Sequence, residues 1–159
     1  MKTIDILCPL YNASKDFETL MKGINQQKEI IVSKIIFPVT ESIDNTLELA
    51  KSVPNAIVHE IKKEDFSHSL TREKEIKYAT SDIVVFMTQD VYLNDEYALK
   101  NLADCIDENI IHAFARQLTK SKGIEKYTRE KNYPKKSYVM SKKDIKKEQI
   151  RTFYSSDAC

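Results

Sequence analysis

The sequence contains almost no glycine, with only Gly23 and Gly123 among its 159 residues. A dinucleotide-binding fingerprint and a Walker-type phosphate loop each need several glycines, because the backbone must approach the phosphates closely. Neither motif can be present. The absence therefore excludes two large classes, the dehydrogenases that bind NAD through that fingerprint and the P-loop NTPases.

Cysteines and long apolar runs are also scarce. The three cysteines, Cys8, Cys105 and Cys159, are odd in number, far apart and without the spacing of metal ligands. This usage is typical of reduced thiols in a cytosolic protein. No apolar run approaches the ~18 residues of a membrane helix, and the N-terminus lacks the pattern of a signal peptide. We therefore expect a cytoplasmic protein, which leaves attachment to the inner face of the cell membrane open.

The remaining composition is that of an ordinary globular chain. The apolar fraction is 42%, the charged fraction 31% and the net charge +1, so the overall charge favours no nucleic-acid partner. The length is that of one domain with a real core. Lysine is concentrated in residues 120–147, which indicates an exposed, charged surface.

Residues 1–115 alternate between strand and helix patterns. Amphipathic spacing predicts helices, for example after Ser14 as N-cap, with Phe17, Leu20, Met21 and Ile24 on one face. Short apolar runs predict five strands, at residues 3–7, 34–39, 56–61, 82–87 and 110–115. The alternation predicts an α/β fold, with a mostly parallel sheet and helices on both faces.

Residues 116–159 are less regular, although we expect them to belong to the same single domain, residues 1–159. An irregular segment is expected over 126–141 and a last short strand over 152–156. The chain reaches Cys159 without a C-terminal helix, which suggests a fragment of a longer protein.

One strand stands out by its polar end. Five apolar residues, Ile83 to Met87, run directly into Thr88, Gln89 and Asp90. Open α/β sheets bind ligands in the crevice beyond the carboxyl ends of their strands, and a carboxylate there suits a divalent cation that holds a phosphorylated ligand. A buried strand followed by an ordinary polar turn is the alternative.

Four loops, at residues 9–12, 40–44, 66–72 and 88–91, are expected at that edge. An aromatic ring could stack on a base, a cation could meet a diphosphate and a carboxylate could hold a metal. Each residue also has a structural interpretation: an aromatic covering the sheet edge, a helix N-cap, a solvated cation or a hydrogen-bonding histidine. No spacing singles out a Ser-His-Asp or Cys-His set. The candidates are Tyr11, Asn12, Glu41, Asp44, His68, Arg72, Gln89 and Asp90.

These segments resemble a known family. Pro9-Leu10-Tyr11-Asn12, followed by a helix that ends in Gln26-Gln27, resembles the start of glycosyltransferase family 2 domains of the GT-A fold. Ser42-Ile43-Asp44-Asn45-Thr46 is similar to the second nucleotide-binding loop of that family. Its rhamnosyltransferase-like branch shows the closest likeness, in blocks at residues 66–72, 86–90, 115–117, 129–134 and 153–157.

The resemblance implies a Rossmann-like GT-A fold, cut short at Cys159, that binds a nucleotide-diphosphate sugar, with a dTDP- or UDP-sugar favoured. Pro9, Tyr11 and Asn12 would line the nucleoside pocket, near Asp44, and Arg72 would approach the diphosphate. Asp90 would bind a divalent cation, Mg²⁺ or Mn²⁺. Family members transfer the sugar with inversion, here to a glycan or lipid-linked acceptor in polysaccharide biosynthesis.

Two departures from the family pattern matter. The family's Asp-x-Asp motif is here Thr88-Gln89-Asp90, so its first acid is missing. The second nucleotide-binding loop of the family usually carries an acid near the strand end, where this chain has Val39-Thr40, so Glu41 would have to supply that acid.

The catalytic base of the family is expected after Cys159, so this chain would be a donor-binding fragment. The alternative is a non-catalytic binding or assembly module with a decayed site, and self-association remains open. A nucleotidyltransferase is disfavoured, because residues 9–14 hold neither glycine nor a basic residue.

Overall fold

The computed structural model describes residues 1–119, 122–133 and 135–148. Contacts divide the chain into two compact units, the first spanning residues 1–113 and the second, in its described part, residues 114–148. Each unit is described by itself. The expectation that residues 1–159 form a single domain stays a prediction.

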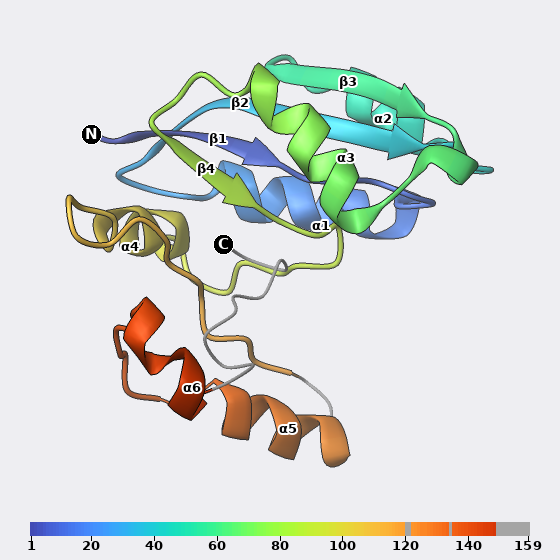
Figure 1. The fold of residues 1–159 in the computed structure, drawn as a ribbon. Coiled ribbons are helices and arrows are strands. Elements are labelled where there is room, and N and C mark those ends of the chain that lie inside the picture. Colours follow the sequence, from blue (N-terminus) through green and yellow to red (C-terminus); the bar gives the residue numbers. More distant parts are fainter. Residues whose placement is uncertain (120–121, 134, 149–159) are drawn as a thin grey trace. The chain divides into compact units, whose positions relative to one another are not determined.

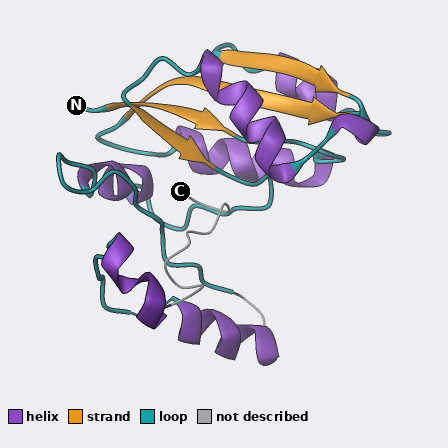
Figure 2. Ribbon diagram, in the orientation of Figure 1, coloured by secondary structure: helices purple, strands orange, loops and turns teal. Residues whose placement is uncertain are grey.

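The first unit is built on a parallel sheet. Its four strands are β1 (Thr3–Leu7), β2 (Ile31–Thr40), β3 (Ala56–Ile61) and β4 (Ile83–Phe86), in the spatial order β3-β2-β1-β4 (Figures 1 and 2). All three pairings are parallel. The predicted α/β class with a mostly parallel sheet is confirmed, and β1 and β2 are its two inner strands. Parallel pairing brings every carboxyl end to the same edge of the sheet.

Helices cover both faces of this sheet. Helix α1 (Ser14–Asn25), helix α2 (Thr46–Lys51) and helix α4 (Ala98–Asp104) contribute to a core on one face. Helix α3 (His68–Glu75) crosses the other face, in front of the sheet in Figure 1. Two short 3-10 turns, η1 (Lys63–Asp65) and η2 (Ile76–Tyr78), flank α3 in the sequence.

Alternation along β2 explains how one strand serves both layers. Ile35, Phe37 and Val39 belong to the core shared with α1, whereas Ile36, between them, is equally buried outside that cluster. The ring of Phe37 packs against Phe17 of α1 with 5.8 Å between centroids. A strand buried on both faces needs a nearly continuous apolar run, which is what residues 35–39 provide.

Asp5 is a charged residue in the middle of this apolar layer. It is fully buried in β1, and its carboxylate accepts hydrogen bonds from the backbone N–H groups of Thr80 and Ser81, at 2.6 and 2.9 Å, and from the Ser81 hydroxyl. Burial acts to raise the pKa of Asp5, but these bonds and the charge of Lys34 together hold it below its ordinary value. The ionised carboxylate thus fixes the entry into β4.

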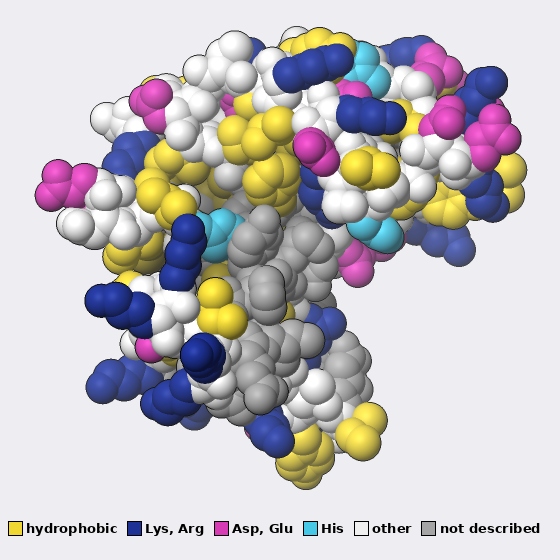
Figure 3. Space-filling model, in the orientation of Figure 1, with side chains coloured by type: hydrophobic (Ala, Val, Ile, Leu, Met, Phe, Trp, Pro, Cys, Tyr) yellow, Lys and Arg dark blue, Asp and Glu magenta, His cyan; other side chains and the backbone are white. Residues whose placement is uncertain are grey.

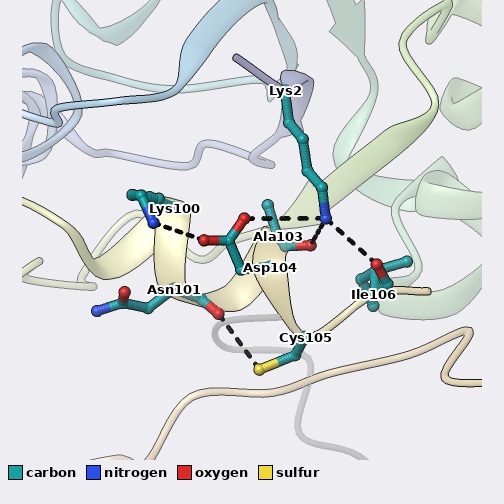
Figure 4. Close-up of polar contacts among 7 residues, drawn as sticks. All are labelled: Lys2, Lys100, Asn101, Ala103, Asp104, Cys105 and Ile106. Carbon is teal, nitrogen blue, oxygen red and sulfur yellow. Dashed lines mark hydrogen bonds and ion pairs between the residues drawn. The ribbon is translucent and has the colours of Figure 1, made fainter.

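A second polar contact joins the N-terminus to α4 (Figure 4). The ammonium group of Lys2 donates to the carbonyl oxygens of Ala103 and Ile106, at 2.7 and 3.2 Å, and lies 3.9 Å from Asp104. Asp104 also pairs with Lys100 at 2.6 Å. A cation at the carboxyl end of a helix satisfies carbonyl groups that have no partner within the helix. Lys2 therefore caps α4.

The second unit contains α5 (Ile124–Asn132), a 3-10 turn η3 (Lys142–Asp144) and α6 (Ile145–Glu148). The carboxyl end of α5 is held by Tyr133, whose ring meets Phe114 edge-on at 6.3 Å. The carbonyl of Tyr133 also accepts a hydrogen bond from Arg116 Nε at 2.9 Å. Within the described residues of the whole chain, no helix is long and apolar enough to cross a membrane.

Several local predictions are wrong. Residues 110–115 form no strand, because Asp107 holds the segment in a turn by accepting from the N–H groups of Asn109 and Ile110. Helix α1 is capped by Ala13 rather than Ser14, whose side chain is used elsewhere. Residues 126–132 of the segment 126–141, which was expected to be irregular, belong to α5, whereas its described residues from 135 to 141 form no helix or strand. The expected strand at 152–156 lies outside the described residues.

Replacing Asp5 by Ala should lower the free energy of unfolding by about 1–3 kcal/mol, because donors at Thr80 and Ser81 lose their acceptor. The pKa of Asp5 is lowered in the folded state, so its contribution is present above the ordinary pKa and is lost as the pH falls. Urea unfolding at neutral and acidic pH measures both effects. The difference should narrow below about pH 4. Glu18→Ala, at an exposed position of α1, is the matched control and should change little.

Candidate functional site

The carboxyl edge of the sheet collects the loops that the sequence singled out. Residues 9–12 follow β1, residues 41–45 follow β2, η1 follows β3 and residues 87–91 follow β4. The chain of β1 continues as far as Leu10, which bridges to Val39 beyond the end of the regular strand. The loops thus start from a rigid base.

Tyr11 and Gln89 join the loop after β1 to the loop after β4. The backbone N–H of Tyr11 donates to Gln89 Oε1 at 2.8 Å, and Gln89 Nε2 donates back to the carbonyl of Tyr11 at 3.0 Å. The side-chain amide of Gln89 therefore pairs with both backbone polar groups of Tyr11, as the backbone of a neighbouring strand would. Its role in the structure is to align two loops, and this leaves its side chain occupied.

Asn12 joins the same loop to the one after β2. Its backbone N–H donates to Ser42 Oγ at 3.0 Å, and its side-chain Oδ1 accepts from the N–H of Ile43 at 2.9 Å. Asn12 has φ of 46°, a left-handed conformation that asparagine tolerates better than most residues. The Ser42 hydroxyl completes the link by donating to the carbonyl of Thr40 at 2.7 Å.

Asp44 holds the amino ends of two helices together. One carboxylate oxygen accepts from the N–H and hydroxyl of Ser14, at 3.1 and 2.6 Å, and the other accepts from the N–H and hydroxyl of Thr46. Thr46 in turn accepts from the N–H of Ala13 at 2.7 Å. We call this set, Ser14, Asp44 and Thr46, the clasp. Burial acts to raise the pKa of Asp44, but the bonds from Ser14 and Thr46 outweigh it and lower that pKa to about 2.

Tyr11 lies at the rim of an open hollow. The ammonium group of Lys63 sits 5.3 Å from the centre of the Tyr11 ring, a distance at which a cation is attracted to the ring face. The backbone N–H of Lys63 donates to Glu41 Oε2 at 3.2 Å. Glu41, Lys62, Lys63 and Glu64 line the hollow, whose volume is about 570 Å³. This space lies beyond the ends of β2 and β3.

His68 and Arg72 occupy successive turns of α3, which begins at His68. Ser67 caps the helix by accepting from the N–H of Leu70 at 3.5 Å. The His68 ring meets Phe66 edge-on, and its carbonyl accepts from Arg72 Nη1 at 2.7 Å. Only 8% of Arg72 is exposed, so its cation is held against the sheet rather than solvated.

Asp90 is exposed at the end of the loop after β4, and one carboxylate oxygen accepts from the Thr88 hydroxyl at 2.6 Å. Within the described part of the chain no donor bonds to the second oxygen, so lone pairs of the carboxylate are available to a ligand. The buried thiol of Cys8 is influenced by the charges of both Arg72 and Asp90. Burial raises the pKa of the Cys8 thiol to about 12, the Arg72 cation opposes this rise and the Asp90 carboxylate adds to it. Both charges therefore lie within electrostatic reach of one point below the loops.

The donor set at this edge fits one kind of cation. Among the described residues, no three side chains of His, Cys, Asp or Glu form a metal-binding group. A single carboxylate instead suits Mg²⁺ or Mn²⁺ shared with phosphates, because such ions keep several waters and use few protein ligands. Asp90 with Thr88 matches that arrangement. These two residues do not match a high-affinity structural metal site, which needs more protein ligands.

Thr40 contributes one further polar atom. The residue is only 3% exposed, and its Oγ1 has no hydrogen-bond partner among the described residues. A buried hydroxyl without a partner costs free energy, so such atoms are uncommon. Thr40 stands at the last position of β2, directly before Glu41, which lines the hollow.

The structure brings most of the predicted residues to this edge. Asn12, Asp44 and Gln89 use their side chains to fasten loops, while Tyr11, Glu41 and Asp90 remain exposed there. His68 and Arg72 are joined to each other on α3, and Pro9 lies in the continuation of β1 that ends at Leu10. Sequence reasoning named Ser14 as an N-cap and Ser42 and Thr46 as part of a loop motif, but it did not foresee the bonds they make here, and it missed Lys63. The Asp44-x-Thr46 spacing is a helix-capping signal that could have revealed Thr46, but Lys63 carries no signal.

The family of this chain is identified by comparison with known proteins. The model of glycosyl transferase family 2 matches residues 5–159. The chain is 34% identical to the O-antigen chain rhamnosyltransferase RfbN of Salmonella typhimurium, over 98% of this chain and 50% of the relative. It is 29% identical to the O-antigen chain rhamnosyltransferase WbaN of Salmonella anatum, over 99% of this chain and 51% of the relative. The chain thus spans about half the length of these relatives.

Solved structures agree on the fold. The S. aureus protein TarS, residues 1–349, in complex with UDP, superimposes with a TM-score of 0.55 and 25% identity, over 68% of this chain and 32% of that one. The mannosyltransferase PcManGT of Pyrobaculum calidifontis, in complex with GDP-Man and Mn²⁺, gives a TM-score of 0.51 at 17% identity, over 63% and 31%. The second likeness shows the fold alone.

The matched family model covers nearly the whole chain, and both Salmonella relatives align along its length. The parallel sheet with loops gathered at its carboxyl edge agrees with these matches. The chain belongs to glycosyl transferase family 2, has the Rossmann-like GT-A fold and is homologous to rhamnosyltransferases of O-antigen synthesis.

Proposed function

We propose that this chain binds the nucleotide-diphosphate sugar donor of an inverting glycosyltransferase. The observation that carries the proposal is the fastening of three loops, by Gln89, Asn12 and Asp44, around the edge that holds Tyr11 and Asp90. A site held by side chain–backbone bonds is ordered before the ligand arrives, so binding loses less free energy to ordering. The rhamnosyltransferase relatives and the UDP complex of TarS favour a dTDP- or UDP-sugar.

The groups at the edge divide into three roles. The exposed ring of Tyr11 stacks on the base beside Pro9 and Asn12, and Lys63 at its face adds a positive charge. The Thr40 hydroxyl and Glu41 lie where polar groups of the base or ribose enter the hollow.

In this proposal, helix α3 supplies the residues that contact the diphosphate. Arg72 is buried against the sheet, and its cation neutralises phosphate oxygens, while His68 shapes the approach from the amino end of the helix. By donating to the carbonyl of Tyr11, Gln89 fixes the position of the loop that carries Asp90.

Asp90 would hold a divalent cation, Mg²⁺ or Mn²⁺, with Thr88 orienting its carboxylate. A cation shared with two phosphates supplies charge neutralisation for the departing nucleotide. Because the chain offers one carboxylate here, we expect the cation to bind with the nucleotide and weakly without it.

In this proposal the acceptor is a glycan or lipid-linked glycan of a polysaccharide pathway, and transfer inverts the sugar. The base that deprotonates the acceptor hydroxyl is expected after Cys159, so residues 1–159 by themselves bind donor and transfer nothing. We also propose that both units belong to one domain, with residues 116–159 beginning its acceptor side. The protein would act in the cytoplasm, at the inner face of the cell membrane.

A non-catalytic nucleotide-sugar-binding or assembly module is the second candidate. The missing first acid, at Thr88, favours it. The two candidates differ in a turnover assay on the longest natural form of the protein, with a dTDP- or UDP-sugar and isolated lipid-linked glycan. Release of nucleoside diphosphate that depends on the acceptor identifies the transferase. Donor binding without release identifies the module.

Replacing Asp90 by Ala should abolish the dependence of nucleotide binding on the cation and leave the fold intact, because Asp90 is exposed. Thermal-shift titrations with UDP, dTDP and GDP, each with Mn²⁺ or with EDTA, measure this. The parent chain should gain stability only with nucleotide and Mn²⁺ together. Asp82→Ala, an exposed acid at the opposite end of β4, is the matched control and should behave as the parent. Absence of any metal-dependent shift in the parent would refute donor binding.

Replacing Asp44 by Asn should loosen the clasp and weaken donor binding, because the charge that attracts four donors is lost. The pKa of folded Asp44 is about 2, below its ordinary value, so the ionised clasp stabilises the protein at neutral pH and loses this effect as the pH falls from about 4 towards 2. At neutral pH the variant should be less stable by about 1 kcal/mol, a modest value because the group is partly exposed. Urea unfolding at several pH values checks this, and an unchanged pH profile contradicts it.

A further inference from the structure

The two units of the chain differ sharply in charge. Residues 1–113 contain twelve Lys and Arg against nineteen Asp and Glu, a net charge of −7. Residues 114–148 contain twelve Lys and Arg against four Asp and Glu, a net charge of +8. The overall charge of +1 hides this asymmetry. A charge difference of this size between parts of a chain is typical of a protein that contacts a polyanionic surface.

Apolar side chains are exposed among these charges. Ile124 is 84% exposed, Tyr127 71% and Val139 75%, and Tyr138 and Ile145 are also exposed. Figure 3 shows yellow apolar and dark-blue basic side chains together over α5 and α6. Isolated apolar residues on a surface need no explanation, but several within one short basic unit indicate a binding surface.

Helix α5 gathers both kinds of side chain on one face. Ile124, Tyr127 and Lys131 are spaced i, i+3 and i+7, so they lie along one stripe of the helix, and all are exposed. The end of the helix is anchored by Tyr133, which packs against Phe114 and accepts from Arg116. Lys142 in η3 and Lys146 in α6 add exposed positive charges after the capping box of Ser141 and Asp144.

We propose that the exposed stripe of Ile124, Tyr127 and Lys131 on α5, together with the exposed Lys142 and Lys146, docks on an anionic lipid bilayer; we call these five residues the basic face. An interfacial helix places aliphatic and aromatic residues at the headgroup boundary and lysines towards the lipid charges. Each lysine near such a surface contributes about 1 kcal/mol. The acidic first unit is repelled by the same surface, so the attraction to the membrane comes from the second unit.

Two other occupants fit less well. A nucleic acid is favoured by arginine and by stacking aromatics, and ten of the twelve basic residues in 114–148 are lysine. The core of a protein–protein interface is depleted in lysine, whereas α5 and α6 each contain two lysines as well as exposed apolar residues. Lysine stems can instead cover apolar surface while their charges remain at the headgroups.

The inference extends the proposed membrane location to a particular surface, and its test does not need a nucleotide. Chain 1–159 is sedimented with vesicles of phosphatidylcholine alone and of phosphatidylcholine mixed with phosphatidylglycerol. Binding should require the anionic lipid and weaken as salt is raised. The triple variant Lys131→Gln, Lys142→Gln, Lys146→Gln should lower the partition coefficient by on the order of five-fold per charge removed.

The matched control carries Lys15→Gln, Lys22→Gln and Lys74→Gln, exposed positions of the first unit that remove the same charge. It should bind as the parent does, whereas Ile124→Ser with Tyr127→Ser should bind less even though no charge is lost. Circular dichroism checks that each variant is folded. Equal loss in the triple variant and the control would overturn the proposal, as would no binding to anionic vesicles. Tighter binding of the parent to an RNA oligomer than to those vesicles would also overturn it, in favour of a nucleic acid.

Discussion

The reciprocal hydrogen bonds between Tyr11 and Gln89 join loops that are 78 residues apart in the sequence. Their geometry depends on parallel pairing, because only parallel strands bring the ends of β1 and β4 to the same edge. Asn12 and Ser42 make the corresponding link to β2, and the clasp around Asp44 fixes the two helices that follow. The edge is thus assembled by polar side chains that substitute for missing backbone partners. The scarcity of glycine fits this design, since side chains rather than bare backbone shape the loops.

The second structural theme is the separation of charge. An acidic unit carries the sheet and the candidate donor site, and a basic unit carries exposed aliphatic and aromatic residues. If both proposals hold, attachment to the membrane would bring the chain that binds the donor to the surface where a lipid-linked acceptor lies. The donor site and the basic face depend on different residues, so each can be removed without the other.

The fold class and the list of loops could be predicted from the sequence. Apolar periodicity and polar residues at strand ends are local signals, and they can be recognised without knowing which segments pack together. Asp44 shows where this reasoning stops: both a nucleotide contact and a helix cap were open from the sequence, and the structure places four donors on its carboxylate. Gln89 is similar, because its partner lies far along the chain. The strand expected at 110–115 failed for a different reason, since an apolar run forms a strand only where a neighbour pairs with it and Asp107 turns the segment away. Lys63 could not be foreseen, because nothing local places a lysine over Tyr11.

The central claim, that the carboxyl edge binds a nucleotide together with a cation at Asp90, is tested most directly by paramagnetic broadening of backbone amide signals. Mn²⁺ is added to the labelled chain in the presence of UDP or dTDP, and signal loss is mapped along the sequence. The account predicts the strongest broadening at residues 88–91, next at Tyr11 and Asn12, and the weakest at the amino ends of the strands near Lys2 and Asn55. Broadening that is centred elsewhere, or that is the same with and without nucleotide, would contradict it.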